Sequence, residues 1–336
     1  MAMRHVVLKH VLSAQPRADD FQILEATPPA CPDGGVRARV LYVSLDPYVG
    51  SRLRGRHMGE APPAPMREPI PGACVAQVVE TRTPDFAIGD VVHTMEGAWA
   101  DEIAIAAGHA RKLDPAMAPL QAHLSALGMP GLTAWAGVTQ RARVGADDIV
   151  LVDAAAGAVG GAVGQIARIK GARAIGVAGG AEKVRLVVNE YGFDACVDYK
   201  APDWEKALDA ALPAAPTLCF ENVSVAMLTT MLSRAAPYAR VVLCGLVDQY
   251  HADAPPPQIP AGLIIGKRAQ VLGLVVYDFY PRWSDFLAEA APWVREGRLR
   301  IAEDVAHGLN GAPALFEKLM QGRNIGKCIV AVAEPS

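Results

Sequence analysis

The chain has 336 residues, of which 51% are hydrophobic and 20% are charged, and its formal net charge is −3. This length fits two domains, and the composition is that of an ordinary soluble globular protein. The near-neutral charge and the lack of a basic run argue against a nucleic-acid binder. We expect no membrane span, because no apolar stretch is long enough, and a cytoplasmic protein, because the N-terminus does not read as a signal peptide.

Cysteine and histidine spacing argues against a metal site. No two of the six cysteines lie within four residues of each other, so the chain has no Cys-x-x-Cys pair. The eight histidines also lack a close paired spacing. We therefore expect buried structural thiols and no bound metal.

In chain order, the first 120 residues are predicted to be rich in β-structure, and the pattern then changes to alternating strands and helices. Early strands are predicted at 36–40 and 73–79, with a turn entering a strand at 88–92 and a loop rich in proline and glycine at 55–72. Later strands are predicted at 149–152, 174–178, 195–198, 217–220 and 241–244, and helices at 158–170, 182–191, 203–212 and 226–235. Beyond residue 300 we expect one strand, a helix at 312–321 and a strand at 327–332. Apolar strands alternating with helices indicate a parallel sheet covered on both faces.

A glycine-rich stretch, DAAAGAVGGAVGQ at 153–165, follows the first of these later strands and opens a helix. This setting is typical of a dinucleotide-binding turn, although its first glycine is replaced by alanine. The alanine is compatible with the turn if it keeps a negative φ. The alternative is a small-residue helix packed under a sheet. The turn and helix N-terminus predicted to bind phosphate comprise Ala155, Gly157, Ala158, Val159 and Gly160.

The end of the second later strand indicates which dinucleotide binds. It reads Gly179-Gly180 and has no carboxylate for the ribose 2′-hydroxyl of NAD. Lys183 and Arg185 follow, and a cation there suits the 2′-phosphate of NADP. Tyr199 could reach the same phosphate. The alternatives are a solvated helix face for the two cations and a half-buried aromatic for Tyr199.

Several segments together resemble a known family. They include LDPYVGSRLRG (45–55), GMPGLTAWAGV (128–138), the block AAAGAVGGAVGQIARIKGARAIGVAGGAEK (154–183) and GRNIGKCIV (322–330). The chain resembles the zinc-free medium-chain dehydrogenases/reductases, in the branch of leukotriene/prostaglandin, alkenal double-bond and curcumin reductases. The resemblance implies an α/β fold with a doubly wound Rossmann sheet and a GroES-like β-barrel domain. It implies a GroES-like catalytic domain of residues 1–121 and 300–336, an NADP-binding domain of residues 122–299, an active-site cleft between them, and a homodimer.

The resemblance also implies roles for individual residues. Lys183 and Tyr199 match contacts to the 2′-phosphate, and Asn222 matches an asparagine beside the cofactor ribose and nicotinamide. Other residues matching contacts to the cofactor are Cys244, Gly245, Tyr250, Val275 and Val276 (the last two on a strand), and Asn324. Residues implied to line the substrate cleft are Tyr48, Trp135, Tyr250 and Tyr277. The chain departs from the family pattern at Glu221, where aspartate is usual, and at Trp135, where tyrosine is common.

These observations predict NADPH-dependent reduction of the carbon–carbon double bond of a small α,β-unsaturated aldehyde or ketone. The candidate donors to the charge that develops at the substrate oxygen are the nicotinamide ribose 2′-hydroxyl and Tyr250. Tyr250 is also the predicted general acid, directly or through water; the alternative is an aromatic that only packs against the ribose. Other readings of the chain remain a quinone reductase, a zinc-free alcohol dehydrogenase of the same fold, and a non-catalytic dinucleotide- or RNA-binding protein.

Overall fold

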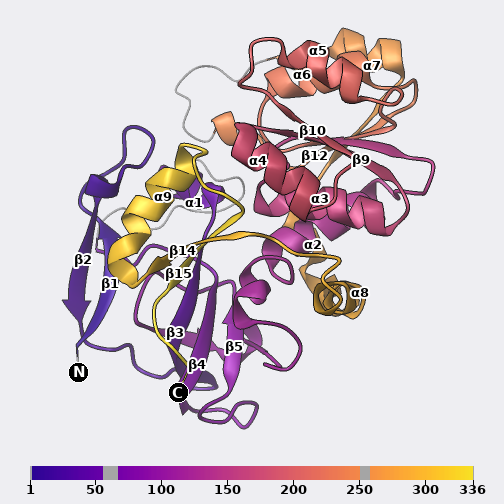
Figure 1. The fold of residues 1–336 in the computed structure, drawn as a ribbon. Helices are drawn as coiled ribbons and strands as arrows, with labels where there is room; N and C mark the ends of the chain where they lie inside the picture. The colour runs from indigo at the N-terminus through magenta and orange to yellow at the C-terminus, as the bar shows by residue number, and fades with distance from the viewer. Residues whose placement is uncertain (1, 56–66, 250–257, 336) are drawn as a thin grey trace. The chain divides into compact units, whose positions relative to one another are not determined.

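The computed structural model describes residues 2–55, 67–249 and 258–335. By contacts, the chain divides into two compact units (Figure 1). Unit 1 comprises Met1–Leu124 and Glu303–Ser336, and unit 2 comprises Ser125–Ala302. Among the helices in the described ranges, none has both the length and the apolar composition that crossing a bilayer requires.

Unit 1 is built around a seven-stranded sheet in the order β14-β15-β3-β4-β5-β7, with β6 paired to β3. All of its pairs are antiparallel except β14 with β15, and β1 and β2 form a separate antiparallel pair. The strands are β1 (Met3–Leu8), β2 (Phe21–Ala26), β3 (Gly35–Leu45), β4 (Cys74–Thr81), β5 (Val91–Thr94), β6 (Glu102–Ala106), β7 (Arg111–Lys112), β14 (Glu303–His307) and β15 (Lys327–Ala331). The helices are α1 (Pro47–Leu53) and α9 (Ala312–Met320).

The core of unit 1 joins segments from both ends of the chain. Trp99 is fully buried, and its ring meets the Phe316 ring of α9 edge-on with the centroids 5.1 Å apart. Phe21 at the start of β2 packs against both rings, at 5.7 Å and 6.0 Å. Large aromatic side chains contribute much of the buried apolar area in such a core. The C-terminal helix is therefore an integral part of unit 1.

Unit 2 contains a six-stranded parallel sheet in the order β10-β9-β8-β11-β12-β13. Its strands are β8 (Ile149–Val152), β9 (Arg173–Ala178), β10 (Ala195–Asp198), β11 (Leu218–Glu221), β12 (Arg240–Leu243) and β13 (Gln270–Gly273). Its helices are α2 (Met129–Trp135), α3 (Ala158–Ile169), α4 (Ala181–Arg185), α5 (Trp204–Ala211), α6 (Val225–Arg234), α7 (Ala261–Lys267) and α8 (Trp283–Arg295). Numbered within the unit, the strand order is 3-2-1-4-5-6, which is that of a Rossmann sheet.

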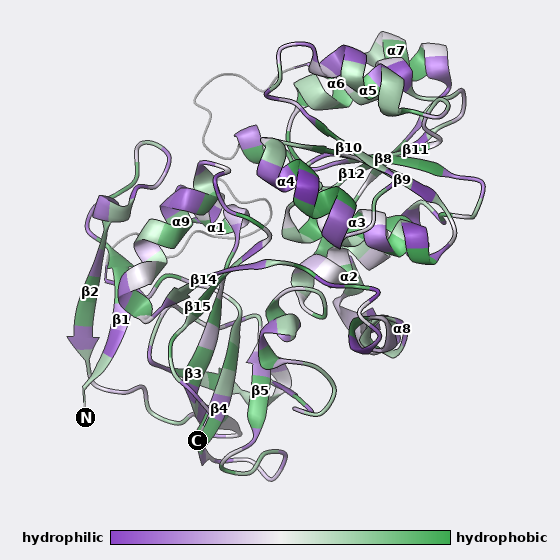
Figure 2. Ribbon diagram, in the orientation of Figure 1, coloured by the Kyte–Doolittle hydropathy of each residue, from purple (hydrophilic) through white to green (hydrophobic). Residues whose placement is uncertain are grey.

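Helices cover both faces of this sheet. Figure 1 shows α5, α6 and α7 over one face and α3 and α4 over the other. The central strands β8 and β11 are almost entirely buried, as expected for a sheet covered on both faces. Figure 2 shows hydrophobic residues concentrated on the strands of both units and mixed along helices such as α4 and α5. Helices α6, α8 and α9 each bury residues at helical spacing and leave the others partly or fully exposed.

The predicted fold class is confirmed, and the elements differ from the expectation in detail. The helix expected at 182–191 is a short α-helix, α4, followed by a π-helical segment, Leu186–Glu190. Strand β13 was not among the predicted strands, and most of its residues are exposed. Val275 and Val276 do not lie on a strand, because β13 ends at Gly273 and Val276 opens a 3₁₀ segment, Val276–Arg282.

Candidate functional site at the switch point of the parallel sheet

The direction in which the sheet of unit 2 is built reverses between β8 and β11. Ligands of open parallel sheets bind outside the carboxyl ends of the strands at such a reversal. Asp153 directly follows β8, and Glu221 is the last residue of β11. Asn222 comes next in the chain and is also buried. The fold therefore brings the glycine-rich turn and these three polar side chains to one edge.

The turn after β8 brings the chain back toward the sheet over a few residues. Ala154 has a left-handed φ of 43°, and the N–H of Gly157 donates to its carbonyl oxygen over 2.7 Å. Ala155 is not among the residues with positive φ, so the condition stated for an alanine at this position is confirmed. A Cβ on Gly160 would lie 2.5 Å and 2.6 Å from the carbonyl oxygens of Ala154 and Asp153. Glycine is therefore required where helix α3 crosses the turn.

The N-terminus of α3 meets the requirements of a phosphate site. Gly157 is its N-cap residue and provides no side-chain hydrogen bond to the first turn. The first N–H groups of a helix have no intrahelical acceptor and carry the positive end of the helix dipole. Ala158 and Val159 are only partly buried there. The residues present thus fit an anionic group such as a pyrophosphate.

At the end of β9, Gly179 and Gly180 form a second tight turn. A Cβ on Gly179 would come within 2.8 Å of the Tyr199 ring, which is 46% exposed. Gly180 has a φ of 101° and precedes α4, on which Lys183 is partly buried. The Gly180 N–H donates to Asp198 Oδ1 over 2.7 Å, and this bond together with one from Lys200 lowers the pKa of the Asp198 carboxyl. Lys183 and Tyr199 thus flank one glycine turn.

Two carboxyl side chains lie side by side under the switch point. Asp153 and Glu221 are 1% and 0% exposed. Asp153 Oδ1 accepts from the backbone N–H of Asn222 over 2.8 Å and from its side-chain Nδ2 over 3.0 Å. Burial raises the pKa of Asp153, and burial together with the charge of Asp153 raises the pKa of Glu221 further. The pair was not predicted from the sequence, although a carboxylate directly follows each of two predicted strands, 149–152 and 217–220.

Further predicted residues lie at the ends of β12 and β13. The N–H groups of Cys244 and Gly245 both point to the carbonyl oxygen of Glu221, at 3.0 Å and 3.4 Å. Val275 is 41% exposed, and the ring of Tyr277 packs edge-on against that of Tyr280 at 5.4 Å. Tyr250, the predicted general acid, lies outside the described residues.

Trp135 occupies a position that differs from a cleft-lining one. It ends α2 and exposes none of its surface. Its ring lies 6.0 Å from the Phe286 ring, and the Arg282 guanidinium sits 5.3 Å from its centroid. In this arrangement Trp135 is part of the core of unit 2, and a contact with substrate stays a prediction.

The predicted residues Tyr48 and Asn324 belong to unit 1, and each lies within a few residues of a buried ion pair. Tyr48 lies on α1, three residues beyond the end of β3, and Asn324 precedes β15, which pairs with β3. Lys327 is 2% exposed, and its Nζ lies 3.1 Å from Asp46 Oδ1 and donates to the carbonyl oxygen of Leu45 over 2.5 Å. The sequence analysis missed this pair, which anchors the start of α1.

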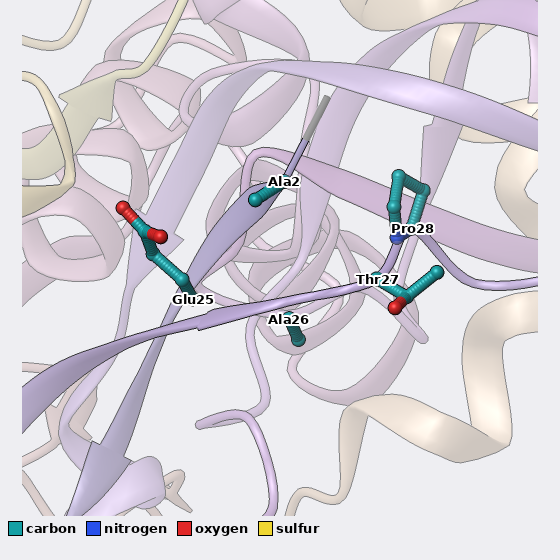
Figure 3. A pocket seen from close by; sticks show the side chains of 5 residues that line it. All are labelled: Ala2, Glu25, Ala26, Thr27 and Pro28. Carbon is teal, nitrogen blue, oxygen red and sulfur yellow. The ribbon is translucent and has the colours of Figure 1, made fainter.

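A depression on unit 1 plays no part in the candidate site. Figure 3 shows its lining, which comes from the residue before β1, the end of β2 and the segment after β2. These residues are Ala2, Glu25, Ala26, Thr27 and Pro28. None of them belongs to the predicted cofactor or substrate residues.

Comparison with known proteins gives near-complete matches. Residues 4–113 match the family described as "N-terminal domain of oxidoreductase", and residues 158–292 match the family described as "Zinc-binding dehydrogenase". The chain is 35% identical to 2-alkenal reductase (NADP(+)-dependent) of Nicotiana tabacum, over 98% of this chain and 97% of that protein. It is 34% identical to the NADPH-dependent curcumin reductase of Escherichia coli (strain K12), over 96% of each chain. The crystal structure of CurA in complex with NADPH from Vibrio vulnificus superposes with a TM-score of 0.91, at 32% identity, covering 99% of this chain and 100% of that one.

The second family description names zinc, and the residues that the structure describes do not fit such a site. In the ranges that the structure describes, no three His, Cys, Asp or Glu side chains are grouped as metal ligands would be. All six cysteines are free thiols. Burial raises the pKa of Cys74, Cys196, Cys219, Cys244 and Cys328 to about 12, which keeps these thiols protonated.

Proposed function

Since the chain belongs to the zinc-free reductase branch of the medium-chain dehydrogenases/reductases, we propose that it reduces the carbon–carbon double bond of α,β-unsaturated aldehydes and ketones with NADPH. The similarity to a 2-alkenal reductase over nearly the whole chain carries this proposal. The glycine turn at the switch point of the parallel sheet supports it independently, because that is where a dinucleotide is held.

The proposed preference for NADPH rests on the second glycine turn. Lys183 and Tyr199 flank Gly179 and Gly180, so a 2′-phosphate there would meet an ammonium group and a phenol. The carboxylate of Asp198 at the same turn already accepts two backbone N–H groups. The Asp198 carboxylate is therefore engaged in stabilising the turn, and the ammonium of Lys183 can attract a phosphate.

The cofactor assignment is tested with Lys183→Ala. Losing a hydrogen bond to a charged group costs about 1.5–3 kcal/mol, so we expect the Kd for NADPH to rise by about 10- to 100-fold. The Kd for NADH should change by less than about threefold, because NADH has no 2′-phosphate. Lys206→Ala is the control, since Lys206 is an exposed lysine of the same unit that pairs with Asp203. Equal losses for both cofactors would remove Lys183 from the 2′-phosphate site.

In the proposed reaction, bound NADPH supplies a hydride to the β-carbon of the substrate. Negative charge then develops on the substrate carbonyl oxygen, where a hydrogen-bond donor stabilises the transition state. We assign that donor to Tyr250. Tyr250→Phe should lower kcat by about 100-fold while leaving the Kd for NADPH nearly unchanged. Unchanged turnover would exclude Tyr250 from the chemistry.

The reaction type is tested by following NADPH absorbance with a panel of substrates. The panel contains short 2-alkenals, cyclic enones, phenylpropenals and quinones, with secondary alcohols and NADP⁺ for the reverse direction. We expect the highest kcat/KM with the unsaturated carbonyl compounds. Turnover restricted to quinones or alcohols would replace the proposal with one of those activities. Binding of single-stranded RNA without any turnover would indicate a non-catalytic protein.

We also propose a cytoplasmic homodimer, as the family resemblance implies. Strand β13 supports the dimer, because it is an edge of the parallel sheet and is largely exposed. An exposed edge strand can pair with a second copy of itself. Light scattering after size exclusion should give twice the chain mass, and cell fractionation should place the protein with cytoplasmic markers. A monomer at micromolar concentration would contradict the dimer.

A further inference from the structure

The buried carboxyl pair Asp153–Glu221 has one oxygen on each side chain that is satisfied and one that is not. Glu221 Oε1 accepts from the backbone N–H groups of Val223 and Ser224 over 2.7 Å and 2.6 Å. Asp153 Oδ1 accepts from Asn222. Across the described parts of the chain, no donor reaches Asp153 Oδ2 or Glu221 Oε2. The side chains that carry these two oxygens, Asp153 and Glu221, interact with each other through a hydrogen bond.

Two carboxylate oxygens can bond to each other only through a proton, because an ionised carboxylate is purely an acceptor. Burial favours the protonated form of a carboxyl, and a second carboxylate nearby favours it again. Both causes raise the pKa of Glu221, and burial raises that of Asp153. One proton between the two side chains satisfies both free oxygens and leaves a single negative charge.

The surroundings offer little other compensation for that charge. The thiols of Cys219 on β11 and Cys244 after β12 face the pair and are held protonated, their pKa raised by burial. Lys267 on α7 acts electrostatically on Cys219, and its ammonium donates to the carbonyl oxygen of Ala235 over 2.7 Å. Within the described residues neither carboxyl has an ion-pair partner.

The pair determines how the Asn222 side chain is turned. Its Nδ2 lies 3.0 Å from Asp153 Oδ1 and 3.4 Å from the Asp153 carbonyl oxygen. Both of these are acceptors, so the amide group facing them is the NH₂ and not the oxygen. The carboxamide oxygen of Asn222 is therefore directed away from the pair, where it can accept from a hydroxyl or amide N–H of a ligand.

We propose that Asp153 and Glu221 share a single proton and act as one positioning unit, which aims the carboxamide oxygen of Asn222 at the nicotinamide end of NADPH. The inference rests on the proposed function, since it takes NADPH as the ligand at the switch point. Neither carboxyl is a catalytic residue. They act through Asn222, whose oxygen accepts a hydrogen bond from a ribose hydroxyl or the nicotinamide carboxamide.

Amide variants test the shared proton, because each single replacement imitates one of its two positions. Glu221→Gln can donate its NH₂ to Asp153 Oδ2 while its oxygen accepts from Val223 and Ser224. Asp153→Asn can donate its NH₂ to Glu221 Oε2 while its oxygen accepts from Asn222. The double variant brings two NH₂ groups together, so one amide must turn and abandon its backbone or Asn222 partners.

The experiment measures the affinity for NADPH and for 2′,5′-ADP, an adenosine-end fragment that lacks the nicotinamide ribose. We expect each single variant to keep NADPH affinity within about threefold of wild type, and the double variant to lose at least about tenfold. Affinity for 2′,5′-ADP should be retained in all three. Asp203→Asn is the control, as this aspartate is exposed on the surface of the same unit. Single effects that simply add up in the double variant would overturn the inference.

If the double variant loses 2′,5′-ADP binding and has therefore unfolded, the pH dependence of NADPH affinity tests the shared proton instead. NADPH affinity of the wild type should fall from neutral to alkaline pH relative to Glu221→Gln, because only the wild type can lose the shared proton. Identical pH profiles would overturn the inference. A wild-type protein that binds no NADPH at all would instead overturn the proposed function.

Discussion

The stability of this protein should fall with rising pH because Glu221 must take up a proton to fold. In the unfolded chain both Glu221 and Asp153 are ionised at neutral pH. In the folded chain we expect the pair to retain one proton, since burial raises the pKa of both groups and the charge of Asp153 raises that of Glu221 further. The contribution of this proton to the free energy of unfolding is complete below the pKa that the carboxyl groups have in the unfolded chain. It is lost as pH rises through their raised pKa in the folded chain.

The size of the effect follows from the proton count. When folding takes up one proton, the free energy of unfolding falls by about 1.4 kcal/mol for each pH unit. Glu221 is fully buried, so solvent screening does not reduce this value. Glu221→Gln keeps the hydrogen bonds without a titrating group. Over roughly two pH units above neutrality, the free energy of unfolding of the wild type should therefore fall by about 2.7 kcal/mol relative to that of this variant.

Urea denaturation at a series of pH values measures this difference, with the free energy extrapolated to water for each protein. Other groups titrate equally in both proteins, so they cancel in the comparison. Glu205→Gln is the matched control, because its carboxylate is 58% exposed and pairs with Arg234 on the surface. Its stability should run parallel to that of the wild type. If the free energy of unfolding of Glu221→Gln showed the same pH dependence as that of the wild type, the shared proton would be refuted.

Three further predictions follow from close packing and burial elsewhere. Gly160→Ala should lower the free energy of unfolding by about 1–3 kcal/mol, measured by thermal unfolding, and should weaken NADPH binding, because its Cβ meets two backbone oxygens. Ala154→Gly is the control, since Ala154 has a left-handed φ and the change should not destabilise the protein. Burial lowers the pKa of His123 to about 4, so stability should decline by about 3 kcal/mol as pH falls from 6.5 toward 4, and less in His123→Gln by urea denaturation. Lys327→Met should cost about 3–5 kcal/mol by the same assay, because it leaves Asp46 buried without its partner, and a double variant with Asp46→Asn should recover part of this loss.

The parallel sheet was predictable because burial on both faces leaves a continuous apolar run in the sequence. The strand predicted at 149–152 is β8 without a shift, and 195–198 is β10. Strand β13 was not predicted, although Val271 and Leu272 are apolar, and the structure shows most of its residues exposed. The residues after it were assigned to a strand by resemblance, whereas the chain turns into a 3₁₀ segment at Val276.

The glycine turn was predictable for a similar reason, since its geometry is local and needs few residue types. The Asp153–Glu221 pair depends instead on the order of the strands. Residues 68 positions apart become neighbours only because β11 pairs with β8 and not with β9. Likewise, the full burial of Trp135 depends on packing against Phe286, which no local pattern encodes.

The carboxyl pair is also linked by hydrogen bonds to two parts of the proposed mechanism, namely Asn222 and the loop that precedes Tyr250. Glu221 holds the N–H groups of Val223 and Ser224, and this segment in turn binds the next loop, since Val247 and Asp248 donate to the carbonyl oxygens of Asn222 and Val223. That loop leads within two residues of Asp248 to Tyr250. We therefore expect Glu221→Ala, which removes the acceptor of these N–H groups, to affect both the proposed cofactor contact of Asn222 and the loop that precedes Tyr250. Lost NADPH affinity with unchanged kcat at saturating cofactor would assign the effect to Asn222 alone, and a fall in both would assign it to both branches.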